Sequence, residues 1–163
     1  MLIAVDTNVL MDLAAEVESV VDALQLVRRR LADARLIVVP TVIQELRYIA
    51  KCGETDEDVH LAVAALQKLA GWGFEPVNFL PVEFGITEQI SLKLRRAGLL
   101  PETEANDSFI LAEAALLGSG LFLTSDSHFA ELDFQLLTLE LKASDVSVPA
   151  IASPREILRK FSG

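Results

Sequence analysis

Four acidic residues in this sequence have surroundings that suit the binding of a divalent cation. They are Asp6, Glu45, Asp107 and Asp126; the first and last follow short apolar runs, and the other two lie on helical patterns. If the four carboxylates meet without basic partners, they repel one another, and some hold a proton at neutral pH. A divalent cation removes this penalty, and ligands that are all oxygen favour Mg²⁺ or Mn²⁺ over zinc. Such a site supports hydrolysis of a phosphodiester bond, because the metal lowers the pKa of a bound water and neutralises charge on the phosphate.

Asp107 is the acid that is hardest to explain as an ordinary surface residue. It shares one face of a predicted helix with apolar residues at three-, four-, seven- and ten-residue spacing, namely Ile110, Leu111, Ala114 and Leu117. Because that face is expected to point toward the core, Asp107 is expected at the rim of the core. A partly buried carboxylate is costly there unless a cation or hydrogen-bond donors compensate it.

Each of the four acids also has an ordinary structural interpretation. Asp6 and Asp126 could cap the helical segments that follow them. Glu45 could be a solvated helix residue, and Asp107 could favour the positive end of its helix. The functional interpretation therefore depends on whether the fold brings the four side chains together.

The pattern of apolar residues predicts a parallel sheet that would do so. Apolar runs typical of strands buried on both faces cover Leu2–Val5, Leu36–Val39, Pro76–Leu80 and Leu121–Thr124, with a weaker run at Val146–Ile151. Helical spacing lies between the runs, first from about Glu16 to Ala34, whereas Phe134–Leu141 fits either a strand or a helix. Alternating strands and helices favour a layered α/β fold with right-handed crossovers. Ligands bind at the carboxyl ends of the strands in such folds, where the acids would lie.

Composition and charge limit the class of protein. The chain has 163 residues, of which 52% are apolar and 23% are charged, so we expect a single folded domain over residues 1–163. Lys and Arg number 14 against 24 Asp and Glu, which gives a net charge of −10. Bulk charge therefore does not favour nucleic acid. Binding of a polyanion is expected to need both a metal and local cations, and to be poor without the metal.

Cysteine, histidine and terminal signals exclude further classes. The sequence has a single cysteine, Cys52, which excludes an internal disulfide. With only two histidines beside it, the sequence does not favour a Cys/His zinc site. The first residues lack the basic start of a signal peptide. The longest apolar stretch, Phe109 to Leu123, is interrupted by Glu113 and is shorter than the roughly 18 residues of a membrane span. We therefore expect a soluble cytoplasmic protein with no membrane partner.

The order and context of the acids resemble the PIN-domain ribonucleases over nearly the whole chain. The segments that carry the resemblance are Val5–Asn8, Val39–Pro40, Ile43–Leu46, Asn106–Ala112, Leu123–Phe129 and Pro149–Leu158. Each motif alone is weak evidence for the family. The four motifs that contain the acids, in the same order and at suitable spacing, are together fairly specific.

The resemblance implies a fold, a reaction and a set of functional residues. The fold is a three-layer α/β/α sandwich with a central, mainly parallel sheet. The reaction is hydrolysis of single-stranded RNA by a metal-activated water. The residues implied to be catalytic and to bind one or two Mg²⁺ or Mn²⁺ ions are Asp6, Glu45, Asp107 and Asp126. The residues implied to orient or support these acids are Thr7, Asn8 and Thr124.

The resemblance also implies partners. Many small bacterial members are toxins that a cognate antitoxin protein inhibits, and many form homodimers. The segment 132–148 is long for a short toxin, which weighs on the toxin interpretation more than on the nuclease interpretation. Arg47 and Lys51, on the predicted helix of Glu45, are the candidates for contact with RNA phosphates, and His128 is a minor candidate for approaching the metal.

Two other functions stay open on sequence alone. The first is a PIN-like scaffold that binds RNA or protein without cutting it; the presence of all four acids disfavours it. The second is a phosphatase with an aspartyl nucleophile. That class needs a second Asp two residues after the first, and Asn8 occupies the position.

Overall fold

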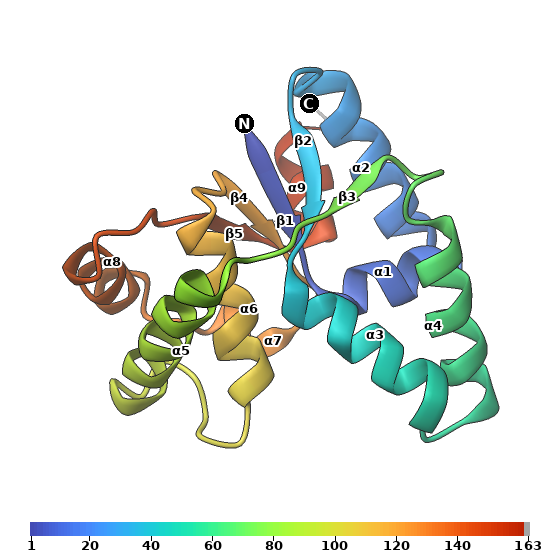
Figure 1. The fold of residues 1–163 in the computed structure, drawn as a ribbon. Helices are drawn as coiled ribbons and strands as arrows, with labels where there is room; N and C mark the ends of the chain where they lie inside the picture. The colour runs from blue at the N-terminus through green and yellow to red at the C-terminus, as the bar shows by residue number, and fades with distance from the viewer. Residues whose placement is uncertain (162–163) are drawn as a thin grey trace.

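A single parallel sheet occupies the centre of the computed structural model, which describes residues 1–161 (Figure 1). Its strands within that range are β1 (Leu2–Val5), β2 (Arg35–Val38), β3 (Phe74–Pro76), β4 (Leu121–Leu123) and β5 (Ala150–Ala152). They lie in the order β3-β2-β1-β4-β5, and every neighbouring pair is parallel. The predicted domain 1–163 also includes residues 162 and 163, which lie outside the described residues.

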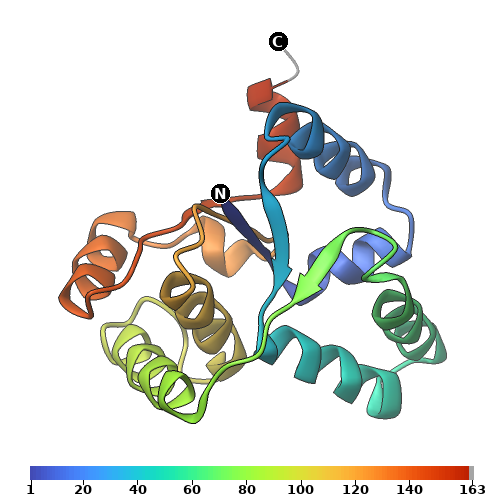
Figure 2. The same ribbon diagram turned by 45° about the horizontal axis from the view of Figure 1, so that its top comes forward.

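Helices cover both faces of the sheet and make the predicted three-layer α/β/α sandwich (Figures 1 and 2). The helices of the described part are α1 (Thr7–Ala14), α2 (Glu18–Arg30), α3 (Pro40–Cys52), α4 (Asp56–Lys68), α5 (Pro81–Arg96), α6 (Ala105–Leu116), α7 (Ser127–Ala130), α8 (Phe134–Ala143) and α9 (Pro154–Phe161). Helices α1 to α4 lie on one side of the sheet and α5 to α8 on the other. On the first side, α3 packs against α4 and α2 against α9; on the second, α5 packs against α6. None of these described helices is both long and apolar enough to cross a membrane.

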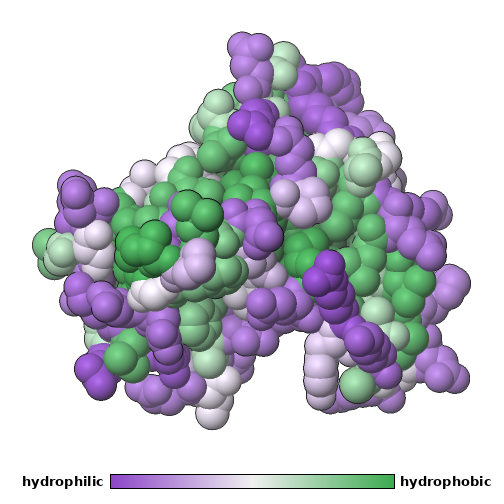
Figure 3. All heavy atoms as spheres, viewed as in Figure 1, coloured by the Kyte–Doolittle hydropathy of each residue, from purple (hydrophilic) through white to green (hydrophobic). Residues whose placement is uncertain are grey.

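The molecule is indented at the edge where the strands end (Figure 3). In this view the indentation separates the side that carries α5 and α6 from the side that carries α3 and α4. Helix α3 follows β2, and α6 leads into β4, so the two helices reach this edge from the two strands that flank β1.

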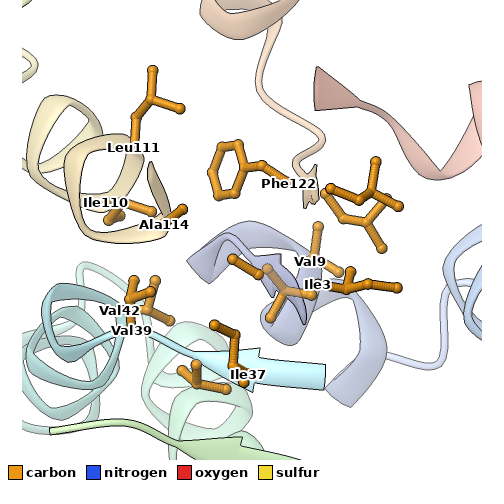
Figure 4. Packing of buried hydrophobic residues seen from close by; sticks show 14 of the residues in the cluster. Ile3, Val9, Ile37, Val39, Val42, Ile110, Leu111, Ala114 and Phe122 are labelled. Atoms are coloured by element: carbon orange, nitrogen blue, oxygen red, sulfur yellow. The ribbon is translucent and has the colours of Figure 1, made fainter. Parts of the chain in front are cut away.

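The burial of both faces of the sheet explains why the strand segments are continuous apolar runs in the sequence. Ile3, Ile37 and Phe122, from β1, β2 and β4, are almost completely buried because helices cover both faces of the sheet. Figure 4 shows Phe122 close to the apolar face of α6, from which Ile110 and Leu111 project. This packing fixes α6 against the sheet one turn after Asp107.

Two expected elements differ in position from the structure. The third strand covers Phe74–Pro76 instead of Pro76–Leu80, because Gly73, with a φ of 73°, ends the turn after α4 and the chain enters the sheet directly at Phe74. The last strand is shorter than expected and begins at Ala150. The ambiguous segment from Phe134 is a helix, and Asp133 caps it by accepting hydrogen bonds from the N–H groups of Gln135 and Leu136.

The helix predicted from about Glu16 to Ala34 is also shorter in the structure, where it is α2, Glu18–Arg30. It begins at Glu18 rather than Glu16, since Glu16 adopts a φ of 57°, which an α-helix does not accommodate. The short helix α1 precedes it, and Asp6 is its N-cap.

Candidate functional site

The order of the strands creates a crevice between β1 and β4. These strands are neighbours, but the chain leaves β1 toward β2 and leaves β4 toward β5, in opposite directions. A ligand site is expected at the carboxyl ends of strands at such a switch point. A cavity of about 670 Å³ lies there, and the residues that line it include all four predicted acids together with Thr7 and Asn8.

Asp6 is the most deeply buried of the four acids, with 3% of its surface exposed. Its Oδ1 accepts a hydrogen bond of 2.7 Å from the N–H of Thr7, and its Oδ2 accepts one of 2.7 Å from the hydroxyl of Thr124. Burial raises the pKa of Asp6 to about 6, although the two hydrogen bonds oppose the rise and the nearby Glu45 and Asp126 add to it. Asp6 thus caps α1, as its ordinary interpretation had it, and also faces the cavity.

Thr124 and Asn8 join the loops that follow β1 and β4. The hydroxyl of Thr124 donates to Asp6 and accepts a 3.0 Å hydrogen bond from the N–H of Asp126. The side-chain oxygen of Asn8 accepts a 3.1 Å hydrogen bond from the N–H of Ser125. These contacts join the loop after β1 to the loop after β4 beside Asp6 and Asp126. The supporting role that the resemblance implies for these positions stays a prediction.

Glu45 projects from α3 and is held by two side chains from other elements. The hydroxyl of Thr7 donates to its Oε2 in a short hydrogen bond, and the amide of Asn106 donates to its Oε1 over 2.9 Å. Sequence reasoning placed Thr7 beside the acids but gave Asn106 no role. The two bonds leave the carboxylate of Glu45 fixed at the wall of the cavity.

Asp107 lies at the start of α6 and carries the strongest sign of a missing partner. Its Oδ2 is buried and has no hydrogen-bond partner among the described residues. Burial, together with the negative charges of neighbouring acids, of which Asp6 has the largest effect, raises the pKa of Asp107 to about 7. An unpartnered carboxylate oxygen beside several other carboxylates fits a bound divalent cation better than it fits an isolated structural acid.

Three side chains lie close enough together to bind one metal ion, and only one of them belongs to the four predicted acids. Within residues 1–161, single ligand atoms of Glu104, Asp107 and His128 all lie within 4.8 Å of one another. The Nδ1 of His128 is 3.9 Å from Asp107 Oδ2 and 3.4 Å from Asp126 Oδ1. Sequence reasoning gave His128 a minor role and assigned no metal to Glu104. Glu104 is the N-cap residue of α6 and lies three residues before Asp107, and this short spacing was the available signal.

Arg47 and Lys51, the predicted contacts for RNA, are exposed on α3. Neither belongs to the residues that line the cavity, which on this helix include Gln44 and Tyr48. Their contact with phosphate stays a prediction.

Glu113 is a further buried acid that sequence reasoning treated only as an interruption of an apolar run. Its carboxylate accepts hydrogen bonds from the N–H of Thr41 over 3.0 Å and from the hydroxyl of Thr41 over 2.8 Å. Burial raises the pKa of Glu113 to about 7, against the lowering effect of the two bonds from Thr41.

These raised pKa values predict how the stability of the metal-free protein depends on pH. Asp6, Asp107 and Glu113 hold protons in the folded state up to pKa values of about 6, 7 and 7, compared with ordinary values of 3.8, 3.8 and 4.5. The folded state therefore binds more protons than the unfolded state between about pH 4 and pH 7, so their contribution is complete at acid pH and is lost as the pH rises. We expect the free energy of unfolding to fall by about 2 kcal/mol between pH 5.5 and pH 8.

Urea unfolding in the presence of a chelator measures this dependence directly. The doubly substituted protein Asp107→Asn, Glu113→Gln is the control, and its stability should change less over the same range because two of the three groups no longer titrate. Equal stability of the unsubstituted protein at both pH values, or greater stability at pH 8, would contradict the prediction.

Comparisons with known proteins agree with the fold. A model of the PIN domain family matches residues 3–135. One similar solved structure is the crystal structure of VapBC2 from Rickettsia felis bound to a DNA fragment from the VapBC2 promoter. A chain in it matches with a TM-score of 0.64 and 14% sequence identity, and the match covers 94% of this chain and 98% of that one. A structure of FitAB bound to an IR36 DNA fragment gives a TM-score of 0.52 and 23% identity, over 93% of this chain and 94% of that one. Comparison with curated proteins gives no match.

Proposed function

Since this chain belongs to the PIN domain family, a family of nucleases, we propose that it is a metal-dependent endoribonuclease that hydrolyses single-stranded RNA. The observation that carries the proposal is the buried Oδ2 of Asp107, which has no hydrogen-bond partner within residues 1–161; Asp107 lines the cavity together with the three other predicted acids. The nuclease activity follows from the family, whereas the dependence on metal and the choice of RNA are the proposed parts.

The residues that would hold Mg²⁺ or Mn²⁺ come from four different elements or loops. They are Asp6, Glu45, Asp107 and Asp126, with Glu104 and His128 beside Asp107. When bound, a cation of this kind lowers the pKa of a water molecule at the site and neutralises charge on the phosphate. No histidine is then required as a general base.

The chain's own residues fix the acids before substrate arrives. The hydroxyl of Thr124 donates a hydrogen bond to Oδ2 of Asp6 and accepts one from the backbone N–H of Asp126. Thr7 and Asn106 hold the carboxylate of Glu45 from two sides. Positioning of this kind lowers the cost of assembling the charged groups around a phosphodiester, because their side-chain freedom is already lost in the folded protein.

The surface charge supports a requirement for metal in substrate binding. The net charge of −10 and the acidic cavity repel a polyanion, so the metal and exposed cations such as Arg47 and Lys51 would have to offset it. We propose that affinity for RNA is poor without the metal.

The proposal extends to partners and location. Two of the solved structures that share the fold are those of VapBC2 and FitAB, each bound to a DNA fragment. This supports an antitoxin protein as the partner of this chain, whose own role would then be that of the toxin in the cytoplasm. We further propose that the chain forms a homodimer and that residues 1–163 are one nuclease domain.

The test is an RNA cleavage assay with purified protein. We expect end-labelled single-stranded RNA to be cut when Mn²⁺ or Mg²⁺ is present and to stay intact when a chelator is added. Double-stranded RNA and single-stranded DNA of the same sequence serve as controls and are expected to be cut more slowly. RNA that is bound but not cut would favour the non-catalytic scaffold and would contradict the proposal.

A further inference from the structure

Glu113 is a carboxylate buried in the apolar interface between helix α6 and the rest of the protein. Only 1% of its surface is exposed, and its neighbours along the helix, Ala112 and Ala114, are completely buried. A carboxylate in such a place destabilises the fold unless hydrogen bonds compensate it. Both oxygens of Glu113 bond to the same residue, Thr41 of α3.

Thr41 stands at the N-terminus of α3, which its own sequence caps poorly. The N-cap residue is Val39, which offers no side-chain hydrogen bond, and the first helical residue is Pro40, which has no N–H. The carboxylate of Glu113 accepts a hydrogen bond from the N–H of Thr41, which belongs to another helix. Above its pKa of about 7, it also places negative charge at the positive end of α3. Glu113 therefore supplies the cap that α3 lacks.

This contact joins the two helices that carry acids of the proposed metal site. On α3, Glu45 lies four residues after Thr41 and therefore on the same face, and both residues line the cavity. On α6, Asp107 lies six residues before Glu113. The bond from Asn106 to Glu45 crosses the same pair of helices nearer the cavity.

We propose that Glu113 is a positioning residue, which sets the register and distance of α3 against α6 through Thr41 and thereby places Glu45 opposite Asp107. The inference rests on the proposed function, since it concerns the geometry of the same metal site. Glu113 does not reach the cavity lining itself, so it acts through Thr41 and not by touching the metal or substrate.

The test measures Mn²⁺ affinity by titration calorimetry rather than activity. Thr41→Val removes the hydroxyl donor but keeps the shape of the side chain, and Glu113→Gln keeps the size of the side chain but removes its charge. We expect each substitution to weaken Mn²⁺ binding about tenfold, the lower end of the range measured when residues that support metal ligands are changed. Thr41→Ser restores the hydroxyl and is expected to recover the affinity.

Thr55→Val is the matched control. Thr55 caps α4 through a 3.0 Å hydrogen bond from the N–H of Asp58 and is not among the residues that line the cavity. Its substitution therefore also removes a hydroxyl from a helix N-terminus, but outside the cavity. We expect Thr55→Val to lower the melting temperature and to leave Mn²⁺ affinity within twofold of the unsubstituted protein. If Glu113→Gln does not fold, the Thr41→Val and Thr41→Ser pair still decides the question.

The outcomes separate this inference from the proposed function. If the unsubstituted protein binds Mn²⁺ and Thr41→Val binds it equally well, Glu113 and Thr41 serve stability alone and the inference is overturned. It is also overturned if Thr55→Val weakens binding as much as Thr41→Val, because loss of stability would then explain both. Failure of the unsubstituted protein to bind Mn²⁺ would contradict the proposed function itself, and the inference with it.

Discussion

We expect replacement of Asp107 by asparagine to abolish RNA cleavage and, at the same time, to stabilise the metal-free protein. The loss of rate should be about 100- to 1,000-fold, since a metal at this site contributes several kcal/mol to the transition state and each 1.4 kcal/mol is a factor of ten. The gain in stability arises because burial, together with the charges of the neighbouring acids, raises the pKa of the Asp107 carboxyl to about 7. At pH 8 the neutral amide removes that repulsion.

The size of the stabilisation is modest because part of Asp107 faces solvent. We expect about 1 kcal/mol, which corresponds to a rise of about 2–4 °C in melting temperature for a protein of this length. Effects of opposite sign on activity and stability are the signature of a functional acid, because a purely structural acid would lower both when it is replaced. Cleavage rates and thermal melts at pH 8, with chelator in the melts, provide the two measurements.

Asp22→Asn provides the comparison for this prediction. Asp22 is an exposed acid on α2, so its substitution makes the same chemical change outside the cavity. Cleavage should persist in that protein with little change in melting temperature. Activity that survives Asp107→Asn would remove Asp107 from the proposed catalytic set.

The second large effect is on thermal stability when Mn²⁺ is added. A ligand that binds only the folded protein stabilises it by about 2.7 kcal/mol at a concentration 100 times its dissociation constant, which corresponds to about 5–11 °C here. The shift should be largest at pH 8 and smaller at pH 5.5. At the lower pH, Asp6 and Asp107, with pKa values of about 6 and 7, hold protons that the cation must displace.

Melting curves with increasing Mn²⁺, at an ionic strength held constant with sodium chloride, measure this shift. Asp107→Asn should lose most of it, whereas Asp22→Asn should retain it. A shift that sodium chloride reproduces, or one that is equal in both substituted proteins, would mean that general screening of the −10 charge and not a specific site stabilises the fold.

The sequence was most informative where burial on both faces produces unbroken apolar runs. Strand β1 matches its predicted bounds, and β2 and β4 match theirs within one residue, which is within the usual uncertainty of strand ends. Strand β3 was harder because it is short and lies at an edge of the sheet, where its pairing with β2 and not its own apolar content decides its position. The segment of α8 was ambiguous for a similar reason, since a ten-residue helix and a strand can share the same apolar pattern.

In the candidate site, too, some residues could be placed from the sequence and others could not. Asp6 and Asp126 follow strands, so the topology of a parallel sheet was enough to place them at one edge. Asn106 and Glu113 could not be assigned a role in this way, because what they do depends on contacts with α3, a helix more than 50 residues earlier in the chain. A polar residue that bonds across a helix pair has the same local appearance in the sequence as one that faces water.

The distance along the chain between β1 and its partner β4 has a consequence for biosynthesis. The hydroxyl that holds Asp6 belongs to Thr124, which the ribosome adds 118 residues later. At about 5–20 residues per second, a ribosome needs roughly 6–24 s to add that stretch. During this interval the growing polypeptide lacks Asp126 and the end of strand β4, so the cluster of four acids cannot be complete before these residues have been added.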